Sequence, residues 1–114
     1  MFNYSARINR IVDGDTMDLA IDLGFRISTD IRIRLNGIDT PETFRPKSAG
    51  EKQHAKEAVA FVTSLIPPGT KVHVKTSKTG KYGRWIADIT LPDNRDLVRV
   101  MLDEGFQKRA AYEL

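Results

Sequence analysis

The sequence predicts a single domain over residues 1–114, a small closed β-barrel of the OB type with two helices. Three observations predict it. Apolar and polar residues alternate in strand-length runs, an amphipathic stretch follows the third run, and the order is three strands, a helix, two strands and a helix. Closing five strands into a barrel removes the free edges of a sheet. From the pattern alone, an open sheet covered by helices (α+β) stays as the alternative.

The first three strands come before the helix. Residues 6–23, "ARINRIVDGDTMDLAIDL", read as two strands joined at Asp13-Gly14, a strong turn dipeptide. On the second strand the inward positions are Met17, Leu19, Ile21 and Leu23. Residues 26–39, "RISTDIRIRLNGID", form the third strand, with apolar residues on one face and two arginines on the other. The apolar face consists of Ile31, Ile33 and Leu35, and the polar face carries Arg32 and Arg34.

The helix that follows has clear start and stop signals. Ser48 and Glu51 fit a capping box. Its apolar stripe consists of Ala55, Ala58, Val59, Val62, Leu65 and Ile66, and "PPG" at 67–69 ends it. "KVHVKT" (71–76) and "RWIADITL" (84–91) are the fourth and fifth strands. "DLVRVMLDEG" (96–105) is a short second helix that Gly105 terminates.

Composition excludes several classes of protein. The chain has no cysteine, so it forms neither disulfides nor thiolate metal sites. It has no apolar run long enough to span a membrane and no secretory leader at Met1, from which we expect a cytoplasmic protein. The net charge of +3 and pI near 9.3 favour a polyanionic partner without requiring one.

Four fragments combine into a candidate site: "DGDT" (13–16), Arg34, "DTPE" (39–42) and "KYGR" (81–84). Each alone is weak evidence, since a hairpin turn, a solvated arginine or a loop explains it equally well. Barrel strands that lie side by side bring the 13–16 turn towards the end of the third strand, where "DTPE" begins. We therefore expect the charged residues of these fragments to meet.

Their chemistry suits hydrolysis of a phosphodiester. Asp15, Asp39 and the carbonyl of Thr40 offer the hard oxygen ligands that Ca²⁺ prefers, and Mg²⁺ also fits this ligand type. Two arginines, Arg34 and Arg84, match phosphate oxygens bidentately. The remaining carboxylate, Glu42, is available to orient or deprotonate an attacking water.

With these residues in place, the chain resembles the staphylococcal nuclease family. The matching stretches are "VDGDT", "IRLNGIDTPE", "GEK…EA", "GKYGRWIADI" and "LVRVMLDEG", in the family's order and spacing between Ile11 and Tyr112. The resemblance implies an OB barrel and Ca²⁺-dependent cleavage of DNA and RNA with little sequence choice, in which the 5′ oxygen leaves and 3′-phosphate ends remain.

The resemblance also assigns roles to individual residues. It implies that Asp15, Asp39 and the Thr40 carbonyl bind calcium, and that Arg34, Glu42 and Arg84 are catalytic. It further implies that Lys81 and Tyr82 contact a neighbouring phosphate and that Tyr112 lies near the bound nucleotide.

Departures from the family pattern leave alternatives open. The secreted nucleases of this family continue into a further C-terminal helix, without which less apolar surface is buried, so the fold is less stable or a partner chain covers the gap. They also carry a signal peptide, from whose absence here we expect an intracellular relative encoded by a plasmid or phage. We expect a monomer.

A degenerate OB module that only binds nucleic acid is the rival function. A basic domain whose charges are merely solvated is the third. The rivals do not explain why both arginines and all three carboxylates are retained.

Overall fold

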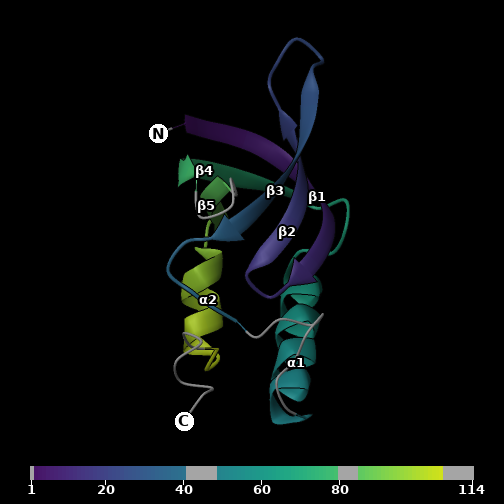
Figure 1. Cartoon of the computed structure of the whole chain (residues 1–114). Coiled ribbons are helices and arrows are strands. Elements are labelled where there is room, and N and C mark those ends of the chain that lie inside the picture. The colour runs from purple at the N-terminus through teal and green to yellow at the C-terminus, as the bar shows by residue number, and fades with distance from the viewer. Residues whose placement is uncertain (1, 41–48, 80–84, 107–114) are drawn as a thin grey trace.

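The computed structural model describes residues 2–40, 49–79 and 85–106. Within these residues, five strands close into a barrel in the order β1-β2-β3-β5-β4, accompanied by two helices (Figure 1). This confirms the predicted fold class over the open-sheet alternative. The elements are β1 Phe2–Asp13, β2 Thr16–Asp22, β3 Ser28–Leu35, α1 Ala49–Leu65, β4 Lys71–Thr79, β5 Trp85–Thr90 and α2 Leu97–Asp103.

Strands β1, β2 and β3 form an antiparallel meander whose alternation builds the core. In the β2–β3 ladder Met17 faces Ile33 and Leu19 faces Ile31. Met17, Leu19 and Ile33 are fully buried, as period-two alternation predicts. The prediction that Leu23 points inward is wrong. Strand β2 ends at Asp22, and Leu23 is 46% exposed.

The barrel closes through β5, which pairs in parallel with β3 and antiparallel with β4. β4 runs to Thr79, beyond the predicted end at residue 76. A register shift between Thr76 and Lys78 interrupts the ladder with β5. Such an irregularity breaks the alternation from which a strand is read, so the sequence pattern stopped before the strand did.

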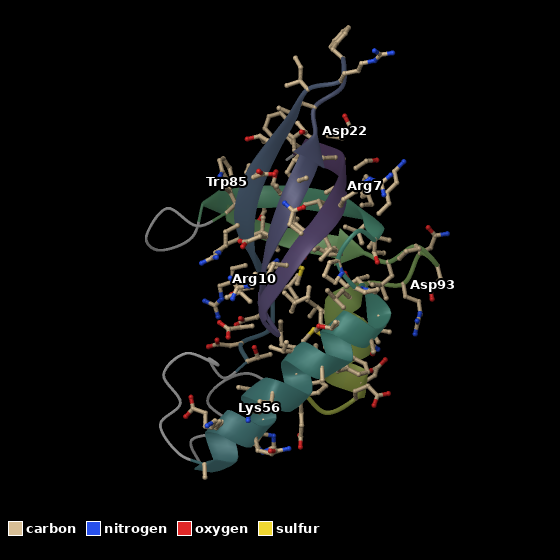
Figure 2. The ribbon with its side chains drawn as sticks, turned by 90° about the vertical axis from the view of Figure 1, so that its right-hand side faces the viewer. Arg7, Arg10, Asp22, Lys56, Trp85 and Asp93 are labelled. Atoms are coloured by element: carbon tan, nitrogen blue, oxygen red, sulfur yellow. The ribbon has the colours of Figure 1, made fainter. Side chains whose placement is uncertain are left out.

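Both helices lie at one end of the barrel, while the β2–β3 hairpin projects from the other (Figures 1 and 2). Helix α1 buries Ala55, Ala58 and Val62, and Ile66 follows its last residue into the core. Helix α2 begins after Asp96, whose carboxylate accepts a hydrogen bond from the backbone N–H of Arg99. In the part of the chain that the structure describes, neither helix is long and apolar enough to cross a bilayer.

Candidate functional site

The 14–15 turn between β1 and β2 lies against the end of β3. The backbone N–H of Leu35 donates to the carbonyl of Asp15 at 2.7 Å, and Thr16 pairs with Arg34 in the β2–β3 ladder. These contacts fix the turn beside the segment that leaves β3. Asp15, Arg34, Asp39 and Thr40 are thereby brought together at the helix end of the barrel.

Asp15 is buried and held by two donors. Asp15 is only 5% exposed to solvent. The backbone N–H of Thr40 donates to Asp15 Oδ2 at 3.1 Å, and the hydroxyl of Thr16 donates to Asp15 Oδ1 at 3.0 Å. Each carboxylate oxygen therefore has a donor, and the backbone of Thr40 and the side chain of Thr16 together orient the group.

Arg34 joins this carboxylate to that of Asp39. Its Nη2 donates to Asp39 Oδ1 at 2.7 Å and lies 3.5 Å from Asp15 Oδ2. The side chains of Arg34 and Asp39 are 30% and 32% exposed, against 7% for Asp15. Two carboxylates thus converge on one positive group, with Asp15 inside and Asp39 at the surface.

The protonation of Asp15 reflects this burial. Desolvation raises the pKa of the Asp15 carboxyl, and the negative charge of Asp39 acts in the same direction. The hydrogen bonds from Thr40 and Thr16 and the guanidinium of Arg34 oppose the rise without cancelling it. Ionised Asp15 is therefore costly here, and additional positive charge beside it would lower that cost.

Gly14 lets the turn approach both α1 and Thr40. A Cβ atom at Gly14 would lie 2.7 Å from the Cβ of Ala58, closer than Cβ atoms come in folded proteins, and 3.0 Å from Cγ2 of Thr40, which is tighter than most Cβ contacts. The small residues at 14 and 58 thus set the distance between α1 and the turn that carries Asp15. This contact makes the helix part of the site's framework.

The oxygen atoms of the site fit a hard cation. In the described part of the chain, Thr40 Oγ1 is buried without a hydrogen-bond partner, 3.1 Å from the Cβ position of Gly14. Buried polar atoms rarely lack a hydrogen-bond partner in folded proteins. Two converging carboxylates and Thr40 supply the oxygen-only donor set of a Ca²⁺ site. Among the described residues, however, no three His, Asp or Glu side chains form a metal-binding group.

Several predicted site residues lie outside the described residues. These are Glu42, Lys81, Tyr82, Arg84 and Tyr112. The 80–84 segment joins β4 to β5, and Trp85 follows it directly. Trp85 pairs with Ile33 next to Arg34 in the β3–β5 ladder, and its side chain is 42% exposed.

Comparison with protein families assigns most of the chain to one family. The family model described as "Staphylococcal nuclease homologue" matches residues 32–113, most of the chain. The chain belongs to the staphylococcal nuclease family. The match includes Arg34, Asp39 and Thr40, so the family resemblance seen in the motifs is confirmed.

Two relatives with a stated activity are similar to this chain. It is 30% identical over 106 residues to the thermonuclease of Staphylococcus intermedius, covering 92% of this chain and 59% of that protein. It is 27% identical over 109 residues to the endonuclease YhcR of Bacillus subtilis (strain 168), covering 90% of this chain and 9% of that protein. The chain therefore spans only part of each relative's length.

Sequence reasoning missed two supports of the site. Thr16 was read only as part of a turn motif, although its hydroxyl holds Asp15. The contact between Gly14 and Ala58 was not foreseen, because it depends on how a helix packs against a distant turn. A hydroxyl residue directly after the buried aspartate was the available signal for the first, since such side chains commonly bond to nearby polar groups.

Proposed function

We propose that this domain is a Ca²⁺-dependent nuclease that hydrolyses phosphodiester bonds of DNA and RNA. The observation that carries the proposal is the convergence of Asp15 and Asp39 on Arg34, beside Thr40, in a chain of the staphylococcal nuclease family. Two of the relatives are named a thermonuclease and an endonuclease, which supports the same reaction class.

The chain's own oxygen atoms would hold the cation. Asp15 and Asp39 would bind it through their carboxylates and Thr40 through its carbonyl. When bound, Ca²⁺ supplies positive charge to phosphate oxygens that become more negative in the transition state. Thr16 and the Thr40 N–H hold Asp15 in one orientation, so little reorganisation is needed on binding.

Arg34 has a second partner available besides the aspartates. Its side chain is 30% exposed, so a phosphate can approach the guanidinium from solvent. A planar guanidinium donates to two phosphate oxygens at once and neutralises charge where it develops. By family position, Arg84 would act on the same phosphate and Glu42 would position or deprotonate the attacking water.

The remaining family positions would place the substrate strand. Lys81 and Tyr82 would contact a neighbouring phosphate, and Tyr112 would lie near the nucleotide. Attack of water on phosphorus with departure of the 5′ oxygen leaves a 3′-phosphate, which is the product we expect. None of these contacts reads a base edge in a groove, so we expect little sequence preference.

The rival function is a module that binds nucleic acid without cleaving it. An OB barrel can do this with a basic surface and exposed aromatic side chains alone. Binding of that kind gives no reason to bury Asp15 with Asp39 beside it, since two carboxylates repel a polyanion. The buried acidic pair therefore favours the enzyme.

A matched pair of variants tests the proposal. Asp15→Asn removes the buried carboxylate, whereas Asp18→Asn removes a half-buried one, 28% exposed, that pairs with Arg32. The purified proteins would be incubated with denatured DNA and with RNA, in Ca²⁺ and then in a chelator. We expect wild type and Asp18→Asn to cleave only with Ca²⁺ and to leave 3′-phosphate ends.

We expect Asp15→Asn to lose most of its activity and to need far more Ca²⁺ for what remains. Glu42→Gln should bind substrate normally and turn it over slowly, because a neutral amide cannot accept the proton of water. A folded wild-type protein that cleaves neither substrate in Ca²⁺, yet binds both, would replace the nuclease by the binding module.

A further inference from the structure

A second feature of the surface lies away from the acidic site, where β1 and β4 meet the β2–β3 hairpin. Here Arg7, Arg26 and Lys71 border a hollow of about 350 Å³, which we call the basic hollow. Its floor includes the small side chains of Ala6 and Ala20. Figure 2 shows Arg7 and Asp22 on one flank of the molecule and Trp85 on the other. The lining of the hollow contains none of Asp15, Arg34, Asp39 and Thr40, so the hollow is separate from the site of Asp15.

The positive charge of the basic hollow is largely unpaired. Among the described residues, the side chains of Arg26 and Lys71 form no hydrogen bond or ion pair, and Arg7 donates only to the carbonyl of Gly69 at 3.1 Å. Asp22 is the carboxylate on its lining, and its Oδ1 accepts the backbone N–H of Gly24 at 2.8 Å. Three cations against one carboxylate leave a net positive hollow.

The backbone sets where on the surface the three cationic residues emerge. Arg7 on β1 pairs with Ala20 on β2 and with Lys71 on β4. Arg7 and Lys71 are therefore direct neighbours on adjacent strands. Arg26 lies in the hairpin turn with φ of 62°, and two hydrogen bonds between residues 23–24 and Ile27 close that turn. The arrangement is thus built by register and turn geometry.

We propose that the basic hollow binds a backbone phosphate of the single-stranded nucleic-acid substrate, several nucleotides away from the bond that is cut. Guanidinium groups match phosphate oxygens, and the serine hydroxyls on the lining, Ser5 and Ser28, are further donors. The apolar floor can accommodate a sugar. This inference rests on the proposed function, because it assumes a nucleic-acid substrate, and it adds a second contact to it.

The spacing between the two sites suits an oligonucleotide. Arg34 pairs with Thr16, and Arg7 pairs with Ala20, so the sites are two strands apart and four residues apart along β2. At roughly 3.4 Å per residue and 4.8 Å per strand, this corresponds to about 17 Å. A single strand of several nucleotides can bridge this separation along the barrel surface. OB folds commonly cover about 4–16 nucleotides.

The test uses two double variants of equal charge. Arg26→Gln with Lys71→Gln removes two cations from the basic hollow, while Lys56→Gln with Arg99→Gln removes one lysine and one arginine that are exposed on the helices. Binding of fluorescein-labelled oligothymidylates of about 16 and about 3 nucleotides would be followed by anisotropy in chelator, over a series of NaCl concentrations.

For the hollow variant, we expect the plot of log affinity for the longer oligonucleotide against log salt to lose about 0.7 from its slope, the contribution of one phosphate contact on a single strand. Affinity for the short oligonucleotide should match that of the helix variant. Lys71→Gln alone should lose less slope than the double variant, which gives a second reading with one substitution.

The outcomes separate this inference from the proposed function. If both double variants give the same slope and affinity, general attraction to a basic protein explains binding, and the basic hollow is not a phosphate site. A wild-type protein that cleaves DNA while the two doubles behave alike overturns this inference alone. If the hollow variant binds the long oligonucleotide more weakly but wild type never cleaves, the contact stands and the nuclease proposal fails.

Discussion

Two arginines of β3, Arg32 and Arg34, meet aspartates in different surroundings. Arg32 lies opposite Asp18 in the β2–β3 ladder and donates hydrogen bonds to both of its carboxylate oxygens, at 2.7 and 3.1 Å. The side chains of Arg32 and Asp18 are 51% and 28% exposed. Arg34 lies opposite Thr16 and reaches past the end of β2 to share one nitrogen between Asp15 and Asp39. One pair is a surface cross-strand contact; the other is a half-buried cluster.

The difference separates an ion pair that costs the fold little from a charged cluster that is unfavourable to bury. An exposed ion pair contributes little and demands little, because water solvates both partners. Burying Asp15 incurs a desolvation cost that a single shared guanidinium, with Nη2 at 3.5 Å, offsets only in part. Residues held in such an unfavourable electrostatic state mark functional sites more often than structural ones. The predictions below use Arg32 and Asp18 as internal controls for Arg34 and Asp15.

The largest effect is expected for catalysis. Arg34→Gln should lower the rate of DNA cleavage about 10²–10³-fold, because a donor aimed at the reacting phosphate is lost. Arg32→Gln should stay close to wild type, since its guanidinium is occupied by Asp18. Initial rates in Ca²⁺, with the melting temperature of each variant as a check on folding, measure both. Equal rates in the two variants would remove Arg34 from the mechanism.

The framework of the buried cluster gives the next effect. Gly14→Ala places a Cβ 2.7 Å from the Cβ of Ala58, so the turn or α1 must move. Overpacking of this kind typically lowers the free energy of unfolding by about 1–3 kcal/mol. In a domain of this size, that corresponds to a fall in Tm of about 4 °C per kcal/mol.

A double-mutant cycle identifies the contact responsible. Ala58→Gly alone should cost about 1 kcal/mol of helix propensity. If Ala58 is the obstacle, combining it with Gly14→Ala should cost less than the sum of the two single changes. Strict additivity, measured by urea unfolding, would mean that the strain lies against Thr40 instead.

The two aspartates should respond to pH with opposite sign. Burial raises the pKa of Asp15 in the folded state, so its contribution is favourable below its ordinary value of 3.8 and is lost as the pH rises through the raised pKa. The side-chain hydrogen bond from Arg32 lowers the pKa of Asp18, whose stabilisation is present above 3.8 and is lost as the pH falls through the lowered value.

Melting curves in chelator check this pair. The Tm of Asp15→Asn, relative to wild type, should rise as the pH is raised from about 4, because the amide carries no charge to desolvate. The Tm of Asp18→Asn should be below that of wild type at neutral pH and should approach it under acid. Parallel curves for the two variants would show that burial does not control Asp15.

Much of this comparison is readable from sequence, because strand alternation decides which face a side chain takes. The pattern of β3 separates Ile33 and Leu35 from the two arginines, and the structure agrees. The turn at 13–16 and the end of β3 meet, as neighbouring barrel strands require. The motifs therefore predict that Asp15, Arg34, Asp39 and Thr40 lie together, and the structure brings these four residues into contact, while their roles stay predictions.

The alternation of apolar and polar residues does not show where each strand ends or how α1 packs on the turn that carries Asp15. Leu23 follows the alternation of β2 but lies beyond its last residue, so it is exposed. Trp85 alternates as part of an apolar strand, yet it is the first residue of β5 and is 42% exposed. The contact of Gly14 with Ala58 spans two elements, and no local pattern encodes it.

The smallest expected effect belongs to the exposed pair itself. A double-mutant cycle of Asp18→Asn and Arg32→Gln should give a coupling free energy of about 0.2–1 kcal/mol, which falls as salt is added because both groups reach solvent. Urea unfolding at low and high NaCl measures it. A coupling well above this range that resists salt would mean that the ladder pair is a structural anchor, and Asp18 and Arg32 would then no longer serve as neutral controls for the Arg34 cluster.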